Sequence, residues 1–132
     1  MESPFKVGMT HEMVQKTGPE HSARKFFPHL PDAYATPILV GLMEGASAEL
    51  MAQHLAPGEQ SVGISMNLKH MRPTPLGMEV RAQTEITQVD GPKLTFKLEV
   101  FDEKEKIAEA VHERFIINGE KFMKKVAAKA AS

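Results

Sequence analysis

Residues 36–55 read TPILVGLMEGASAELMAQHL, and this stretch decides the fold. Thr36 suits the N-cap of a helix, Pro37 suits its first position, and Pro57 and Gly58 follow its end. Apolar side chains occupy nearly every side of the first turns and leave hardly any polar face. We therefore predict a long helix over residues 36 to about 55, buried on most sides beneath a wrapping sheet.

Four segments after the helix have the composition of strands. We predict them over residues 61–70, 78–86, 94–100 and 107–117, with an edge strand near the start over residues 7–14. The turn signal Asp90-Gly91-Pro92 makes the second and third strands antiparallel. In the first strand, alternation with a period of two predicts an inward row made up of Val62, Ile64, Met66, Leu68 and His70.

Two further segments are less periodic. Residues 18–34 carry three prolines, so we interpret them as a loop or a broken short helix that can serve as a lid. Residues 120–132 interleave lysines with alanines, which predicts a basic tail that favours helix but is short enough to fray. The predicted order is a strand, a helix and four strands in a single domain over residues 1–132.

Composition predicts a cytoplasmic globular protein. The chain has 42% hydrophobic residues, which is enough for one core without a disulfide or a metal, and it has no cysteine. The start lacks a leader pattern, and no stretch is apolar enough to cross a bilayer. Because 16 basic residues stand against 17 acidic ones, we expect contact with neither nucleic acid nor membrane.

Glu44 is the most unusual residue of the predicted helix, because an ionisable carboxylate stands inside an apolar run. A buried carboxylate has a raised pKa or a hydrogen-bonded partner, and a general base or nucleophile uses either condition. The alternative is a structural carboxylate bonded to the backbone or to an arginine. We interpret Glu44 as functional, since small residues on both sides leave room beside it.

His70 and Thr36 are the other two candidates. His70 continues the inward row of its strand, and an unperturbed histidine pKa of about 6.5 suits proton transfer at neutral pH. A hydroxyl and free N–H groups at the start of a helix can bind a polarised carbonyl oxygen, which is the functional interpretation of Thr36. Each residue also has a structural alternative, as a satisfied core histidine and as a helix cap.

The spacing of Thr36 and Glu44 excludes direct contact between them in one chain. Eight residues along a helix correspond to a rise of about 12 Å. If both residues act on one substrate, either the substrate spans that distance or a second subunit brings its helix alongside. We favour a homodimer and leave a tetramer open.

Metal chemistry is not predicted. His112-Glu113-Arg114 begins like a zinc-protease motif, but the second histidine is missing and the context is a strand. The remaining histidines show no spacing that gathers metal ligands.

Two stretches resemble the fluoroacetyl-CoA thioesterase family of hot-dog proteins. They are YATPILVGLMEGASAELMAQHLAPGEQSVGISMNLKHMRPTPLG at residues 34–77 and VHERFIINGEKFMKKV at residues 111–126. The resemblance implies an α+β hot-dog fold, in which a long antiparallel sheet wraps one central helix, and a dimer. It also implies a catalytic constellation of Thr36, Glu44 and His70 at the dimer interface, with Gly63 and Arg114 as substrate-binding residues.

The segment before the helix departs from the family. PHLPDAYATP at residues 28–37 is shorter than the family stretch that carries aromatic lid residues. Phe26, Phe27 and Tyr34 are the aromatic candidates in this chain. Because a lid shapes that end of a pocket, we expect a short or modest acyl chain and do not infer fluoroacetyl selectivity.

These observations favour an acyl-CoA thioesterase, a thioester hydrolase for which coenzyme A is part of the substrate and no cofactor is expected. Glu44 attacks or activates water, His70 moves a proton, and Thr36 orients or stabilises the carbonyl oxygen. The rival hypotheses are a hot-dog enoyl-CoA hydratase or dehydratase and a non-catalytic acyl-CoA-binding module. Hydration of crotonyl-CoA tests the first rival, and persistence of bound acyl-CoA tests the second.

Overall fold

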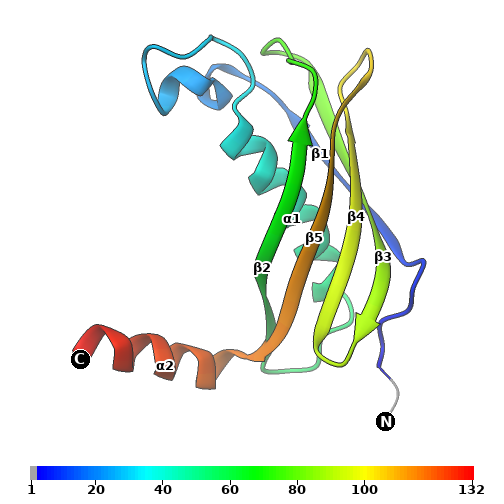
Figure 1. Ribbon diagram of the computed structural model, residues 1–132, viewed down its shortest axis with the longest axis vertical. Coiled ribbons are helices and arrows are strands. Elements are labelled where there is room, and N and C mark those ends of the chain that lie inside the picture. Colours follow the sequence, from blue (N-terminus) through cyan, green and yellow to red (C-terminus); the bar gives the residue numbers. More distant parts are fainter. Residues whose placement is uncertain (1–2) are drawn as a thin grey trace.

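The computed structural model describes residues 3–132, in which a curved antiparallel sheet wraps around one long helix (Figure 1). The sheet order is β1-β3-β4-β5-β2, so β1 and β2 are its edge strands. In chain order the elements are β1 (Thr10–Lys16), the 3₁₀ helices η1 (Pro19–His21) and η2 (Ala23–Lys25), α1 (Thr36–Ala52), β2 (Glu59–His70), β3 (Glu79–Asp90), β4 (Lys93–Phe101), β5 (Lys106–Asn118) and α2 (Gly119–Ala131).

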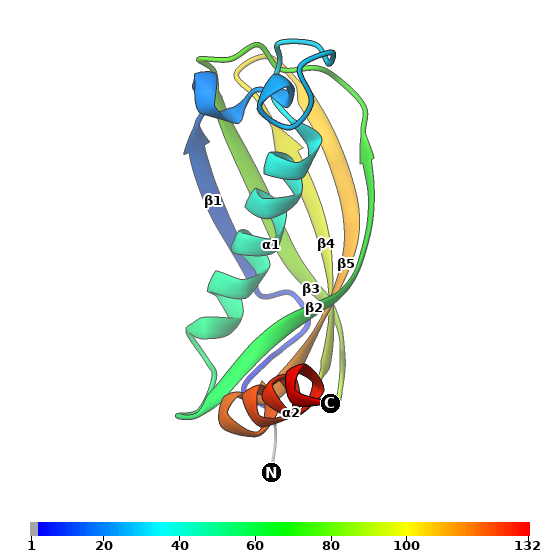
Figure 2. The same ribbon diagram turned by 90° about the vertical axis from the view of Figure 1, so that its left-hand side faces the viewer.

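The core lies between α1 and the concave face of the sheet (Figure 2). Both predicted strands of the central hairpin are confirmed, and their alternate residues face the helix. A row in β3 and a row in β4 are almost fully buried, with members Val80, Ala82, Thr84, Ile86, Leu94, Phe96, Leu98 and Val100. Apolar burial on this scale is the main stabilising contribution to the fold.

The prediction that α1 is buried on most sides is wrong for the single chain. The sheet covers one face of the helix, and the opposite face carries small residues such as Gly41 together with Glu44, whose side chain is 46% exposed. The helix also ends at Ala52, earlier than predicted, and its N-cap is Ala35. A helix that is apolar all round therefore keeps one uncovered face here.

The predicted inward row of β2 is wrong at its first half. A bulge between Gly63 and Ser65 makes Ile64 an extra residue, and the Ile64 side chain is 50% exposed. Gly63 pairs with Arg114, whereas after the bulge Met66 pairs with His112, so both Gly63 and Met66 face the helix side. The bulge thus brings a glycine, not an apolar side chain, to the concave face.

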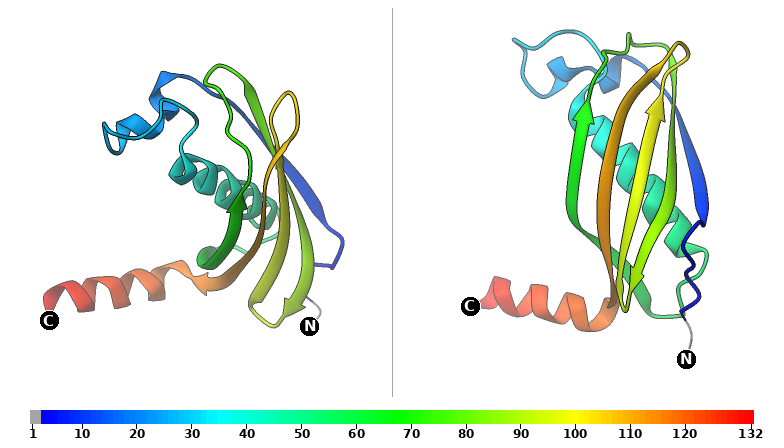
Figure 3. Two further views of the ribbon diagram at one scale, coloured as in Figure 1. Left: turned by 45° about the horizontal axis from the view of Figure 1, so that its top comes forward. Right: turned by 45° about the vertical axis from the view of Figure 1, so that its right-hand side comes forward.

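The two ends of the chain also differ from expectation in detail. The edge strand spans Thr10–Lys16 instead of residues 7–14, because Gly8 adopts a positive φ of 98° in a turn before it. The basic tail is the helix α2, capped by the Asn118 side chain, which accepts from the Lys121 N–H, and it projects away from the sheet (Figure 3). Within residues 3–132 no helix has the length and apolar character of a membrane span.

Candidate active site

Thr36 and His70 meet where α1 begins and β2 ends. The Thr36 Oγ1 lies 2.8 Å from the His70 Nδ1. The predicted capping role of Thr36 is wrong, because Ala35 is the N-cap and no side chain makes a capping hydrogen bond there. The hydroxyl is therefore available to the imidazole, and the two side chains form what we call the Thr36–His70 pair.

The surroundings of His70 favour its neutral form. Burial lowers its pKa, and the backbone of Arg72 offsets part of that effect. The ring is therefore mainly neutral at neutral pH, with its Nδ1 directed to the Thr36 hydroxyl. Its Nε2 is buried and makes no hydrogen bond of normal geometry to the described residues. A neutral imidazole in contact with a hydroxyl can accept its proton or donate one to a neighbouring group.

A cleft of about 410 Å³ opens beside the Thr36–His70 pair. One wall comes from the segment between η2 and α1, and the other comes from the turn that follows β2. The residues that complete the lining include Leu30, Pro31, Tyr34, Met71, Arg72 and Pro73. Arg72 thus places a positive charge next to the pair.

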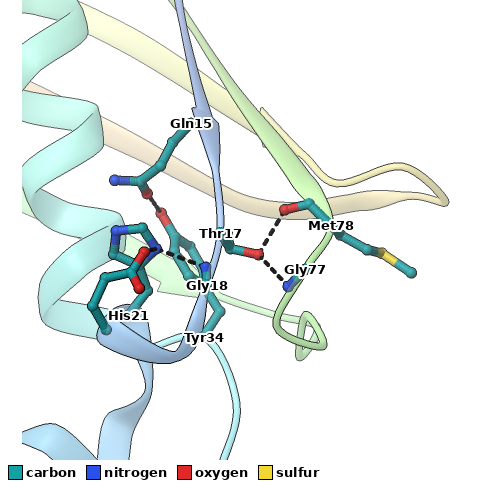
Figure 4. Close-up of polar contacts among 8 residues, drawn as sticks. Gln15, Thr17, Gly18, His21, Tyr34, Gly77 and Met78 are labelled. Atoms are coloured by element: carbon teal, nitrogen blue, oxygen red, sulfur yellow. Dashed lines mark hydrogen bonds and ion pairs between the residues drawn. The ribbon is translucent and has the colours of Figure 1, made fainter.

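The predicted lid segment is a loop with two 3₁₀ turns, as expected from residues 18–34. Figure 4 shows how it is anchored: the Tyr34 hydroxyl donates to the Gln15 side chain, and the Gly18 N–H donates to the His21 Nδ1. Tyr34 is buried, which raises its pKa, and it lines the cleft. The other two aromatic candidates, Phe26 and Phe27, are 44% and 59% exposed.

Thr17 ties the base of this loop to the sheet. Its Oγ1 donates to the Met78 carbonyl oxygen at 2.6 Å and accepts from the Gly77 N–H at 2.9 Å (Figure 4). These bonds join the end of β1 to the turn before β3. The loop is therefore fixed at its base, and its exposed part lies around the two phenylalanines.

Glu44 lies in a second cluster, which we call the Gly63 notch. A Cβ at position 63 would lie 2.7 Å from the Glu44 Oε2 and 3.3 Å from the Arg114 Nη1, so glycine is the residue that leaves the Glu44 carboxylate in this position. The Arg114 Nη1 donates to the Glu44 Oε2 at 3.4 Å, and Arg114 also donates to the Ser61 Oγ and backbone oxygen. Burial lowers the pKa of Arg114, and the negative charge of Glu44 opposes that shift.

The structure therefore brings the five predicted site residues together as two sets. Thr36 and His70 form one set, and Glu44, Gly63 and Arg114 form the other. Thr36 and Glu44 both lie in α1, so the helical rise of about 12 Å between them applies in this chain. Within residues 3–132 no three acidic or histidine side chains converge as metal ligands.

His112 is a neighbour of the notch that the analysis of spacing did not single out as a site residue. Its Nε2 is the third atom near the missing Cβ of Gly63, at 3.6 Å. One feature of the sequence could have indicated it: His112 is two residues before Arg114 in β5, so the two side chains lie on the same face of the strand.

Comparison with known proteins places the chain in a family. Residues 18–120 match the family described as fluoroacetyl-CoA-specific thioesterase. The chain belongs to this family. The fluoroacetyl-CoA thioesterase of Streptantibioticus cattleyicolor is 34% identical over 134 residues, which cover 96% of this chain and 95% of that relative.

Solved structures of the fluoroacetyl-CoA-specific thioesterase have the same fold. A point mutant has a TM-score of 0.91 at 32% identity and covers 97% of this chain and 99% of its own. A second point mutant, in complex with fluoroacetate, has a TM-score of 0.90 at 32% identity over 95% of this chain and 98% of its own. The predicted α+β hot-dog fold is confirmed, and this family member is an acyl-CoA thioesterase, a thioester hydrolase.

A more distant likeness supports the fold alone. A hot-dog-like protein from Thermanaerovibrio acidaminovorans has a TM-score of 0.87 at 22% identity, over 95% of this chain and 93% of its own. The two rival activities, enoyl-CoA hydration and acyl-CoA binding without catalysis, are not favoured by the family match.

Proposed function

We propose that this thioesterase hydrolyses a short or modest-length acyl-CoA at a site composed of Thr36, Glu44 and His70 from two subunits of a homodimer. The observation that carries the proposal is the 2.8 Å contact between the Thr36 Oγ1 and the His70 Nδ1 at the cleft. A hydroxyl paired with a mainly neutral imidazole suits a reaction in which a carbonyl oxygen gains negative charge and a leaving group needs a proton.

The proposed chemistry assigns one task to each residue. Glu44 either attacks the thioester carbonyl carbon, which gives an anhydride that water then hydrolyses to the free acid, or accepts a proton from the water that attacks this carbon. The C–S bond breaks, the coenzyme A sulfur leaves, and His70 moves a proton to it. The Thr36 hydroxyl donates a hydrogen bond to the carbonyl oxygen as its negative charge develops.

Gly63 and Arg114 are proposed to receive the acyl group. The Gly63 notch has no side chain of its own, and the buried Arg114 guanidinium directs polar atoms toward it. Its relatives are named for fluoroacetyl-CoA, a two-carbon acyl thioester. Glu44 and Arg114 bound a narrow recess, so we expect a small acyl group to be favoured there. Coenzyme A enters as part of the substrate, and we propose no separate cofactor.

The dimer is supported by surfaces that the single chain leaves uncovered. The face of α1 that carries Gly41 and Glu44 is not covered by the sheet, and β2 has an unpaired edge on which Ile64 is 50% exposed. A two-fold axis near these surfaces sets the Glu44 of each subunit against the Thr36–His70 pair of its partner, which closes the separation of about 12 Å. Light scattering distinguishes this dimer from a tetramer.

The cytoplasmic location stays a prediction, and cell fractionation tests it.

The decisive experiment is thiol release from a panel of acyl-CoA esters, from acetyl and fluoroacetyl through propionyl, butyryl and phenylacetyl to longer chains. Wild type and Glu44→Gln are assayed side by side, with circular dichroism and light scattering to show that fold and assembly match. We expect the variant to lose at least about a hundredfold in turnover on the best ester. Normal turnover by the variant would overturn the role of Glu44, and a clear preference for long chains would overturn the proposed substrate range.

A further inference from the structure

His112 is a buried residue of β5, and among residues 3–132 neither of its ring nitrogens has a hydrogen-bond partner. It lies on β5 between Met66 of β2 and Phe96 of β4, and it is 1% exposed. Its ring centroid is 5.8 Å from that of Phe96. The Nδ1 and Nε2 are both buried, and within the described residues neither has a hydrogen-bond partner.

A buried imidazole without hydrogen-bond partners is unfavourable if the residue serves only to pack the core. A neutral imidazole has one N–H donor and one acceptor nitrogen, and burying either without a partner costs stability. Burial, together with the positive charge of Arg114, lowers the pKa of His112 to about 4, so the ring is neutral at neutral pH. A phenylalanine at 112 would fill the same space beside Phe96 without this penalty. The histidine therefore indicates a polar role that the free enzyme leaves unfulfilled.

The Gly63 notch shows which group can fulfil it. The three heavy atoms nearest to the missing Cβ of Gly63 are all polar: the Glu44 Oε2 at 2.7 Å, the Arg114 Nη1 at 3.3 Å and the His112 Nε2 at 3.6 Å. A negatively charged acceptor and a ring nitrogen without a partner among the described residues thus lie at the same small opening, and this nitrogen can donate when the ring carries its hydrogen on Nε2. β2 adds no charge to it, since its residue there is the glycine.

The Glu44 carboxylate is free enough to change its partner. Arg114 holds it by a contact of 3.4 Å, which is near the outer limit of a hydrogen bond, and the Glu44 side chain is 46% exposed. Arg114 is itself fixed by the Ser61 Oγ at 3.0 Å and the Ser61 backbone oxygen at 3.1 Å. The arginine therefore stays in place while the carboxylate turns about its own side-chain bonds.

We propose that His112 is a positioning residue for Glu44, whose carboxylate accepts a hydrogen bond from the His112 Nε2–H when acyl-CoA occupies the site. This inference rests on the proposed function of Glu44. The bound acyl group excludes water from the exposed side of the carboxylate, and the hydrogen bond from His112 replaces part of that hydration. Arg114 then binds the carboxylate from one side and His112 from the other, which keeps it ionised and directed at the thioester.

The test compares two substitutions that separate packing from hydrogen bonding. His112→Phe keeps an aromatic ring beside Phe96 but has no donor, whereas His112→Gln retains an N–H at the reach of the Nε2. Both are assayed for thiol release as a function of pH, with thermal unfolding as a check on folding. In His112→Phe we expect kcat to fall at least about tenfold while KM changes less than about threefold.

The pH profile distinguishes positioning from a structural role. Because the hydrogen bond forms in the complex with acyl-CoA, loss of the donor disfavours the ionised carboxylate there, so the acid limb of kcat should move to higher pH by about one unit in His112→Phe. The acid limb of kcat/KM, which reports the free enzyme, should stay in place. His112→Gln should recover most of the rate and of the limb position. A His112→Phe profile that superimposes on wild type, or equal losses in the two variants, would overturn the proposal.

Two further measurements keep the outcome decisive. In the Glu44→Gln background, His112→Phe should cause no additional loss, because the partner of the hydrogen bond has already changed. If Glu44→Gln itself turns over normally, the proposed function fails. If Glu44→Gln is inactive while His112→Phe is normal, this inference alone fails.

If His112→Phe does not fold, nitrogen NMR of histidine-labelled wild type with a non-hydrolysable acyl-CoA thioether replaces the kinetic test. A hydrogen-bonded Nε2–H must then appear with the thioether, and its absence contradicts the proposal.

Discussion

A Cβ at Gly63 would lie 2.7 Å from the Oε2 of Glu44, a distance that side-chain carbons do not tolerate. Gly63→Ala therefore forces the carboxylate to turn away, because the carboxylate is the end of a flexible side chain and the strand is not. We expect kcat/KM to fall at least about tenfold. The melting temperature should stay the same or rise, since alanine is less costly than glycine in a strand. Full activity in the alanine variant would contradict the placement of Glu44 at the notch.

Thr36 allows a direct test of function against helix capping. Because Ala35 is the N-cap, Thr36→Val should change the free energy of unfolding by less than about 0.5 kcal/mol. Activity should fall at least about tenfold, since valine removes the hydroxyl that contacts His70. Thr36→Ser keeps the hydroxyl and is the matched control. A loss of stability without a loss of activity would restore the capping interpretation.

The shared site predicts complementation between inactive subunits. Mixed dimers of Glu44→Gln and His70→Asn chains contain one site in which both residues are native. If half of the dimers are mixed after refolding together, about one quarter of the wild-type activity should return. A site that lies within one chain gives no recovery, because every copy then carries one of the two substitutions. Each variant refolded alone is the control.

The buried imidazole of His112 predicts a stability that depends on pH. Its pKa is about 4 in the folded chain and near the ordinary 6.5 when unfolded, so between these values the unfolded chain binds more protons. The stabilising effect of a neutral His112 is thus complete above pH 6.5 and is lost as the pH falls toward 4, by at most roughly 3 kcal/mol. Urea unfolding should show a steeper fall for wild type than for His112→Phe over this range. Parallel curves would contradict the buried, unpaired ring.

Arg72 predicts how salt affects substrate binding. It lines the cleft, and its 3.9 Å ion pair with Glu105 is exposed, so it remains available to a coenzyme A phosphate. Arg72→Met should raise KM by about threefold or more and reduce its salt dependence, with kcat unchanged. Lys97→Met removes the same charge from the opposite face of the sheet and should have no effect on KM. An equal effect of both variants would point to overall charge alone.

The sequence predicts the central part of the fold because the pattern there is local. The hairpin of β3 and β4 has only Gly91 and Pro92 between its paired ends, and its alternation has no interruption on the buried row of β4. A period of two and a turn signal suffice for such a unit. The long helix is predicted for the same reason, with its last turn placed three residues too far.

The first half of β2 shows why the rest was not predictable. Alternation places Gly63 on the outer row, whereas the resemblance to the family places it at the acyl group. The bulge at Ile64 explains the difference, and its position depends on pairing with β5, which follows some fifty residues later. A window of adjacent residues contains no information about that partner.

The sequence suggests which residues form the candidate site, but it does not show which of them contact one another. Thr36 and His70 are 34 residues apart in sequence, and only the folded sheet shows that the end of β2 reaches the start of α1. Glu44 was expected to be buried, but its exposed side lies on the face of α1 that one chain leaves uncovered. The homodimer that would cover this face, the single domain over residues 1–132 and the roles of the three residues stay predictions.

The order of strands also determines when this enzyme can first become active. β2 is synthesised early but pairs only with β5, the last strand of the chain, and β5 supplies Arg114 and His112. β5 must therefore be synthesised before the edge of β2 is paired and before Arg114 and His112 complete the Gly63 notch. Until then the nascent chain exposes an unpaired strand to its neighbours, and a product that stops short of β5 has no complete site.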